Sequence, residues 1–172
     1  MEKCETFKKI DRNYLEINSL NDLNETNSPS NDFSIKLLEP VDFQLNKFFY
    51  KLIGKKHQWV DRLVWTNKRW LDYASDKNVK TYVLKNKDDL AGYFELNLHK
   101  EKNEVEIAYL GLLEEYHNQK IGSFLLSSAI KNSFIFNPNR VWVHTCSLDH
   151  KNALNNYISR GMKIFKKESI SI

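Results

Sequence analysis

The chain has few cysteines, glycines and prolines, and no long apolar run. Among its 172 residues there are two cysteines, five glycines and three prolines. Cys4 and Cys146 give neither a metal-binding spacing nor a disulfide framework, and so few thiols fit a reducing compartment. No apolar stretch approaches the length of a membrane span, and the N-terminus has no signal-peptide core. We therefore expect a soluble cytoplasmic protein that needs no metal.

An excess of charge of one sign is also missing. The chain carries 26 Lys and Arg against 22 Asp and Glu, which gives a net charge of +4. This mild basicity favours anionic ligands such as a nucleotide cofactor, but nucleic-acid binding requires a clustered basic patch that the sequence lacks. Hydrophobic residues make up 41% of the chain and aromatic residues 13%. Such a composition and length indicate one folded globular domain.

The composition divides the chain at residue 32. Residues 1–32 form an N-terminal segment, in which residues 1–11 are charged and expected to be loose. Residues 14–17 fit a short strand, and the Asn-, Ser- and Asp-rich remainder of the segment reads as a polar linker. Residues 33–172 are expected to form a single domain.

Hydrophobic periodicity predicts an alternation of strands and helices in this domain. Strands are expected at 33–38, 81–84, 90–98, 104–112, 140–146 and 162–170, and helices at 41–53, after a Thr66 cap, at 121–136 and at 152–159. The order is strand, two helices, three antiparallel strands, helix, strand, helix, strand. It predicts an α/β protein of the α+β type, with a mixed, mostly antiparallel sheet and helices on both faces.

Two acidic residues are expected to share one face of the central hairpin. If residues 100–103 form a four-residue loop, Glu95 lies opposite Ala108 and Asn97 lies opposite Glu106. Val105, Ile107 and Tyr109 then alternate along the other face of the central strand.

The turn after the central strand has the residues of an anion site. Gly111 near the strand's end indicates a bulge or a close backbone approach. The polar turn His117-Asn118-Gln119-Lys120 then leads into a helix at Ile121-Gly122-Ser123. The first N–H groups of a helix have no internal partner, and the helix dipole adds positive potential. An ordinary strand-to-helix connection with one packing glycine fits these residues equally well.

This turn resembles the acetyl-CoA-binding motif of the GCN5-related N-acetyltransferase (GNAT) family. That motif reads Arg or Gln, two residues, Gly, one residue, then Gly or Ala, followed by a leucine-rich helix. His117, Lys120 and Gly122 occupy the key positions in one register. In the other register Gln119 and Gly122 match, and Phe124 replaces a small residue.

The resemblance extends beyond this turn. Ala153, Tyr157 and Gly161 keep the spacing of the family's last helix, and His150 stands where the family has Asn. Similar segments occur at 48–70, 91–96, 105–113 and 140–165. Together they resemble an uncharacterised bacterial GNAT subgroup and imply the GNAT fold.

The resemblance implies a cofactor site along the central strand and turn. Backbone amides from His117 to Ser123 are implied to hold the pyrophosphate, and the strand end is implied to hold the pantetheine. The implied contacts are Leu110, Gly111, Leu112, His117, Asn118, Gln119, Lys120, Ile121, Gly122, Ser123, His150, Asn152 and Tyr157. We expect Lys120, which stands in place of a glycine, to be tolerated without a positive φ.

The resemblance also implies an N-acetyltransferase that moves the acetyl group of acetyl-CoA directly to a primary amine. Glu106, or Glu95 on the same face, is the expected base, and Tyr157 is the expected acid for the thiolate. A solvated Glu106 and a tyrosine packed against the sheet are the structural alternatives. Cys146, on the strand face of His144, is interpreted as a packing residue.

The acceptor is expected between residues 43–73 and the open end of the central strands. Substrate-binding candidates are Tyr50, Trp65, Glu95 and His144, although aromatic clusters of this kind more often form a core. The acceptor is a small-molecule or peptide amine, with no nucleic acid or membrane partner, and a homodimer is left open.

Two other functions fit the residues. One is a module that senses acyl-CoA without turnover, and the other is a structural protein that has lost the cofactor. Nucleotide hydrolysis is disfavoured because no Gly-Lys-Ser/Thr sequence follows the turn.

Overall fold

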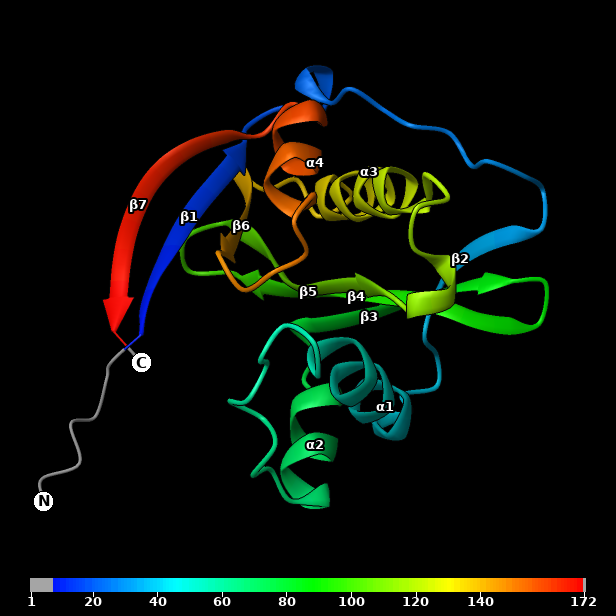
Figure 1. Cartoon of the computed structure of the whole chain (residues 1–172). Coiled ribbons are helices and arrows are strands. Elements are labelled where there is room, and N and C mark those ends of the chain that lie inside the picture. Colours follow the sequence, from blue (N-terminus) through cyan, green and yellow to red (C-terminus); the bar gives the residue numbers. More distant parts are fainter. Residues whose placement is uncertain (1–7, 172) are drawn as a thin grey trace, which may run out of the picture.

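The computed structural model describes residues 8–171, which contribute seven strands to one sheet (Figure 1). The strands lie in the order β2-β3-β4-β5-β6-β1-β7. Within these residues every neighbouring pair is antiparallel except β5 with β6, which is parallel. The predicted mixed, mostly antiparallel sheet is therefore confirmed.

The helices and strands follow the predicted order. They are β1 (Lys9–Ile17), the 3-10 helix η1 (Leu20–Asp22), β2 (Phe33–Leu37), α1 (Phe43–Gly54), α2 (Asn67–Ala74), β3 (Val79–Asn86), β4 (Asp89–His99), β5 (Glu104–Leu112), the 3-10 helix η2 (Glu114–Tyr116), α3 (Ile121–Phe134), β6 (Arg140–Cys146), α4 (Ala153–Ser159) and β7 (Lys163–Ser171). Thr66 caps α2 as predicted, because its side chain accepts a hydrogen bond from the Arg69 amide. None of the helices in residues 8–171 has the length and apolar character needed to cross a bilayer.

Strand β1 is longer than the sequence indicated. Part of the segment expected to be loose, from Lys9 onward, is already strand, while residues 1–7 lie outside the described part of the chain. Tyr14 of β1 pairs with His144 of β6 on one side and Lys166 of β7 on the other. The N-terminal strand is thus built into the same sheet as the later strands, and the division at residue 32 stays a prediction.

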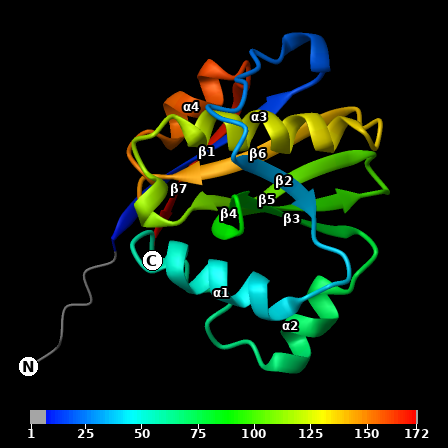
Figure 2. The same ribbon diagram turned by 90° about the vertical axis from the view of Figure 1, so that its right-hand side faces the viewer.

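Helices cover both faces of the sheet, as predicted. Helices α3 and α4 lie on one face, and α1 and α2 lie on the other (Figures 1 and 2). The larger apolar cluster lies under α3 and includes Ile107 and Leu125, while a smaller one lies under α1. In the smaller cluster the rings of Phe49 and Tyr93 stack with their centroids 4.8 Å apart. Burying each such side chain stabilises the fold by about 1.5–3 kcal/mol.

A bulge changes the predicted register of β4 against β5. Asn97 faces Glu106 as predicted, but Glu95 faces Tyr109 instead of Ala108. Ala108 is the additional residue on the bulged strand, so the side chains that follow it change faces. Tyr109 therefore points toward α1, and the predicted alternation holds only as far as residue 107.

The second of the two expected reasons explains Gly111, because α1 packs closely against the backbone of β5 at this position. A Cβ atom there would lie 2.6 Å from Cγ2 of Ile53, so any larger residue would push α1 away from β5.

The parallel pairing of β5 and β6 is short. Only residues 104–106 of β5 pair with residues 140–142 of β6. Beyond these residues the strands diverge, so the facing edge of β5 has backbone groups that the sheet does not pair. The divergence opens the sheet near its centre.

A buried ion pair joins the loop after α1 to the sheet. The Arg62 side chain is 5% exposed and that of Glu95 is 0% exposed, and their atoms Nη1 and Oε2 are 2.9 Å apart. The Tyr73 hydroxyl donates to Glu95 Oε2 over 2.8 Å, and Asn46 Nδ2 donates to Oε1 over 3.0 Å. The carboxylate thus has donors for both of its oxygens.

Replacing Glu95 by Gln is expected to destabilise the protein by about 3–5 kcal/mol, because it leaves the Arg62 charge buried without an anion. Urea unfolding followed by circular dichroism measures the change. Asp72→Asn is the matched control, because it breaks the exposed Lys68–Asp72 pair and should cost at most about 0.5 kcal/mol. Equal costs for the two variants would contradict this account.

Candidate functional site

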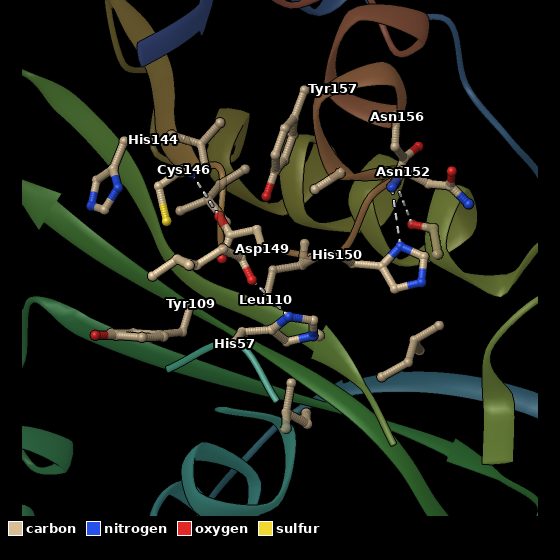
Figure 3. Close-up of a pocket in the computed structure, with 18 of the residues that line it drawn as sticks. His57, Tyr109, Leu110, His144, Cys146, Asp149, His150, Asn152, Asn156 and Tyr157 are labelled. Atoms are coloured by element: carbon tan, nitrogen blue, oxygen red, sulfur yellow. Dashed lines mark hydrogen bonds between the residues drawn. The ribbon is translucent and has the colours of Figure 1, made fainter. Parts of the chain in front are cut away.

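A cavity of about 900 Å³ lies where β5 and β6 diverge. It is lined from the side of α3 and α4 by residues such as Tyr157 and from the side of α1 by residues such as Trp59. Figure 3 shows its walls, with side chains from β5, β6, α4 and the loops between them. The cavity therefore reaches both sides of the sheet.

Most of the residues expected to bind the cofactor line this single cavity. They are Leu110, Gly111, Leu112, His117, Asn118, Lys120, Ile121, Gly122, Ser123, His150, Asn152 and Tyr157, and the substrate candidate His144 lines it as well. Gln119 lies outside the lining, and its Nε2 donates to the Glu115 carbonyl.

The turn before α3 has two left-handed residues. Asn118 has a φ of 61° and Lys120 a φ of 62°. The expectation that Lys120 avoids a positive φ is therefore wrong, and a left-handed residue with a side chain costs about 1–2 kcal/mol. Lys120 is also the N-cap of α3 and makes no capping hydrogen bond with its side chain. Turns of this shape direct successive N–H groups to one side, which favours an anion.

Three histidines from separate segments meet beside this turn. His57 follows α1, His117 precedes α3 and His150 precedes α4, and all three line the cavity. The ring centroids are 5.2 Å apart for His117 and His150 and 6.4 Å apart for His57 and His150. Burial, and then the neighbouring His117 and His57, lower the pKa of His150. Within residues 8–171 no three His, Cys, Asp or Glu side chains are arranged to hold a metal ion.

Tyr157 extends from α4 into the cavity (Figure 3). Its side chain is 8% exposed, and its ring belongs to the larger apolar cluster. Burial, and then the charge of Asp149, raise the pKa of Tyr157 well above its usual value. The hydroxyl therefore stays protonated at neutral pH and can donate a proton or a hydrogen bond.

His144 and Cys146 lie on one face of β6 and both line the cavity. The sequence predicts that Cys146 is a packing residue. In the structure it is half-buried and lines the cavity wall. His144 is open to the cavity, although enough protein surrounds it that burial, and then Arg12, lower its pKa. Its imidazole is therefore neutral at pH 7 and able to accept a proton.

The other expected site residues lie away from the cavity wall. Glu95 is taken up by its buried ion pair, and Glu106 is 16% exposed with its Oε2 2.8 Å from Nε2 of His99. Trp65 packs over the guanidinium groups of Arg62 and Arg69. Tyr50 is fully buried and its hydroxyl donates a hydrogen bond to Asp61, so it lies behind a residue of the cavity wall and does not line the cavity itself.

Sequence reasoning missed two polar residues at the cavity. Asp149 accepts hydrogen bonds from the Thr145 hydroxyl and the Cys146 amide, which fixes the loop before α4. Asn156 donates to the Gly122 carbonyl and joins α4 to the start of α3. Asp61, a carboxylate within the aromatic segment after α1, lines the opposite end.

The chain is similar to known proteins in sequence and in fold. The acetyltransferase (GNAT) family model matches residues 43–162. The sequence matches no curated protein.

Several solved structures share the fold. A GCN5-related N-acetyltransferase from Kribbella flavida has a TM-score of 0.68 at 11% identity, over 94% of this chain and 57% of that one. Another from Sphaerobacter thermophilus has a TM-score of 0.69 at 12% identity, over 96% of this chain and 52% of that one. An aminoglycoside acetyltransferase from an uncultured soil metagenomic sample, in complex with trehalose, has a TM-score of 0.64 at 17% identity, over 77% of this chain and 90% of that one.

The first two of these chains are much longer than this one, which spans just over half of their length. At such low identities the similarity shows the fold alone, whereas the family match covers well over half of the chain. The chain belongs to the GNAT acetyltransferase family.

Proposed function

We propose that the protein is an N-acetyltransferase that moves an acetyl group from acetyl-CoA directly to a primary amine. The observation that carries the proposal is the cavity through the divergence of β5 and β6, with an anion-binding turn on one side of the sheet and aromatic and acidic residues on the other. Because residues from both sides of the sheet line this one cavity, a donor on one side and an acceptor on the other can meet there.

The cavity suits acetyl-CoA in shape and in chemistry. The unpaired edge of β5 near Leu110, Gly111 and Leu112 can hydrogen-bond an extended chain of amides, such as pantetheine, in the way that an added strand would. At the N-terminus of α3, the left-handed Lys120 and the nearby His117 suit the pyrophosphate.

Two side chains supply the proton transfers of the reaction. Bound acetyl-CoA would supply an activated acetyl group as its thioester. His144 accepts the proton that the amine loses as the C–N bond forms. Tyr157 provides a proton for the sulfur as the C–S bond breaks. The proton that leaves the amine balances the one that the thiol gains.

His144 has better support as the base than either carboxylate. Glu95 is saturated by donors, and Glu106 hydrogen-bonds His99 away from the cavity wall. Catalysis by Glu95 or Glu106 stays a prediction from the sequence. Acyl-CoA sensing without turnover is the second candidate, because Lys120 and His117 depart from the residues usual in the turn.

Gly122→Val tests the donor site. A Cβ atom at Gly122 would lie 3.9 Å from both Asn156 Nδ2 and Leu112 Cδ1, so α3 has room for it while a branched side chain fills the cradle. We expect acetyl-CoA to bind at least about tenfold more weakly, with the same thermal unfolding midpoint. Calorimetric titration with acetyl-CoA, CoA and ATP measures this, and Gly122→Ala is the smaller control. Wild-type protein should bind both CoA forms but not ATP, and an unchanged affinity in Gly122→Val would contradict the proposed cradle.

Tyr157→Phe separates catalysis from sensing. The variant keeps the ring and loses the proton donor, so kcat should fall by about 100-fold or more while the dissociation constant of acetyl-CoA stays the same. Thiol release from acetyl-CoA in the presence of a panel of amines measures the rate. If wild-type protein binds acetyl-CoA and releases no thiol with any amine, sensing is the better account.

The pH profile tests His144. A base acts in its neutral form, and the pKa of His144 is lowered, so kcat/KM should hold from high pH down to about 6.5, the usual histidine pKa, and fall only below it. His144→Gln should remove this acid limb and reduce the rate by about 100-fold. His99→Gln, outside the cavity, is the control. Loss of the limb in Glu106→Gln instead would assign the base to that carboxylate.

A further inference from the structure

Asp61 is held in place at the α1 side of the cavity by two tyrosines. The Tyr50 hydroxyl donates to Asp61 Oδ1 over 2.8 Å. The Tyr109 hydroxyl lies 3.0 Å from Oδ1 and 2.9 Å from Oδ2. Tyr50 comes from α1 and Tyr109 from β5, where only the bulge at Ala108 turns its ring to this side. The carboxylate is thus oriented by two separate elements.

The negative charge of Asp61 has no cation to balance it within residues 8–171. The neighbouring Arg62 directs its guanidinium to Glu95, 2.9 Å away, so its charge is already neutralised. Burial, and to a smaller degree Asp61 itself, raise the pKa of both Tyr50 and Tyr109, so their hydroxyls are neutral donors. A neutral donor orients a carboxylate without cancelling its charge.

Aromatic rings stand beside the carboxylate. Trp59 and Tyr109 meet edge to face with their centroids 4.7 Å apart, and both line the cavity with Asp61. The ring of Tyr50 lies 5.7 Å from that of Trp59. A carboxylate next to aromatic faces is suited to an ammonium group, which is attracted by the charge and by the ring quadrupoles.

The two sides of the cavity differ in the polar residues that line them. His57, His117, His150 and Lys120 line the side of the turn, whereas Asp61 lies toward α1. Burial, and then Arg12, lower the pKa of His144, while the charges of Glu106, Asp149 and, least of the three, Asp61 raise it. Arg12 faces Glu168 of β7 in the sheet register and so has an acidic neighbour of its own.

We propose that Asp61 binds an ammonium group of the acceptor other than the one that is acetylated, so that the acceptor is an aliphatic diamine or polyamine. Asp61 and the rings of Trp59 and Tyr109 hold the distal cation, and the near amine lies toward His144. A monoamine of the same length lacks the second contact. This inference rests on the proposed acetyl transfer and names its acceptor class.

Acceptor selectivity in Asp61→Asn is the decisive experiment. The rate of thiol release from acetyl-CoA is measured with 1,4-diaminobutane, spermidine and n-butylamine. Wild-type protein should prefer the diamines in kcat/KM, and in Asp61→Asn that preference should fall by about 10- to 100-fold, as for the loss of one charge-assisted hydrogen bond. Asp72→Asn removes an equal charge from an exposed position on α2 and should leave the preference unchanged.

A binding measurement separates this inference from the chemistry. Calorimetric titration of 1,4-diaminobutane into the protein saturated with CoA should show binding to the wild type and at least about tenfold weaker binding to Asp61→Asn. Both proteins should bind acetyl-CoA equally, which shows that the variant is folded. Normal acetyl-CoA binding with no diamine binding, or with an unchanged diamine preference in Asp61→Asn, would overturn the acceptor assignment and leave the donor site standing. Failure to bind acetyl-CoA would overturn the proposed function and the acceptor assignment with it.

Discussion

The buried ion pair of Arg62 with Glu95 holds together the part of the molecule that forms the α1 side of the cavity. Removing two charges from water costs several kcal/mol for each ion, so the pair persists only because Tyr73 and Asn46 complete the hydrogen bonds of the carboxylate. The pair ties the loop after α1 to β4, and this loop carries Trp59 and Asp61. It also uses the one arginine that is adjacent to Asp61, so that arginine does not form an ion pair with Asp61.

The divergence of β5 from β6 creates the cavity of this fold. Because the two strands pair over only three residues of each, one cavity connects the turn before α3 with the aromatic segment after α1. His144 and Tyr157 lie between a side rich in imidazole and a side with a free carboxylate. In the proposed reaction, this arrangement would keep an anionic donor and a cationic acceptor apart until their reacting atoms meet.

Local patterns predicted the elements and the Thr66 cap, because periodicity and capping residues are encoded within a few positions. Most of the cavity wall was predicted only through the resemblance to the GNAT family. The bulge was not predicted at Ala108 because the one glycine of the strand, Gly111, lies three residues further on, and nothing in the local sequence marks the position at which the register shifts. The strained φ of Lys120 was missed because the tertiary structure imposes it against local preference. Asp61 and the three histidines come together only through contacts between distant segments.

The position of β1 between β6 and β7 has a consequence for how the protein folds. β1 precedes its partners β6 and β7 by more than a hundred residues of chain, and Tyr14 hydrogen-bonds Glu168 with a sequence separation of 154. Pairings with such large sequence separation slow folding, because the entropy of closing a long loop is lost before the contacts form. During synthesis β1 therefore stays without its two partner strands until β6 and β7 have emerged.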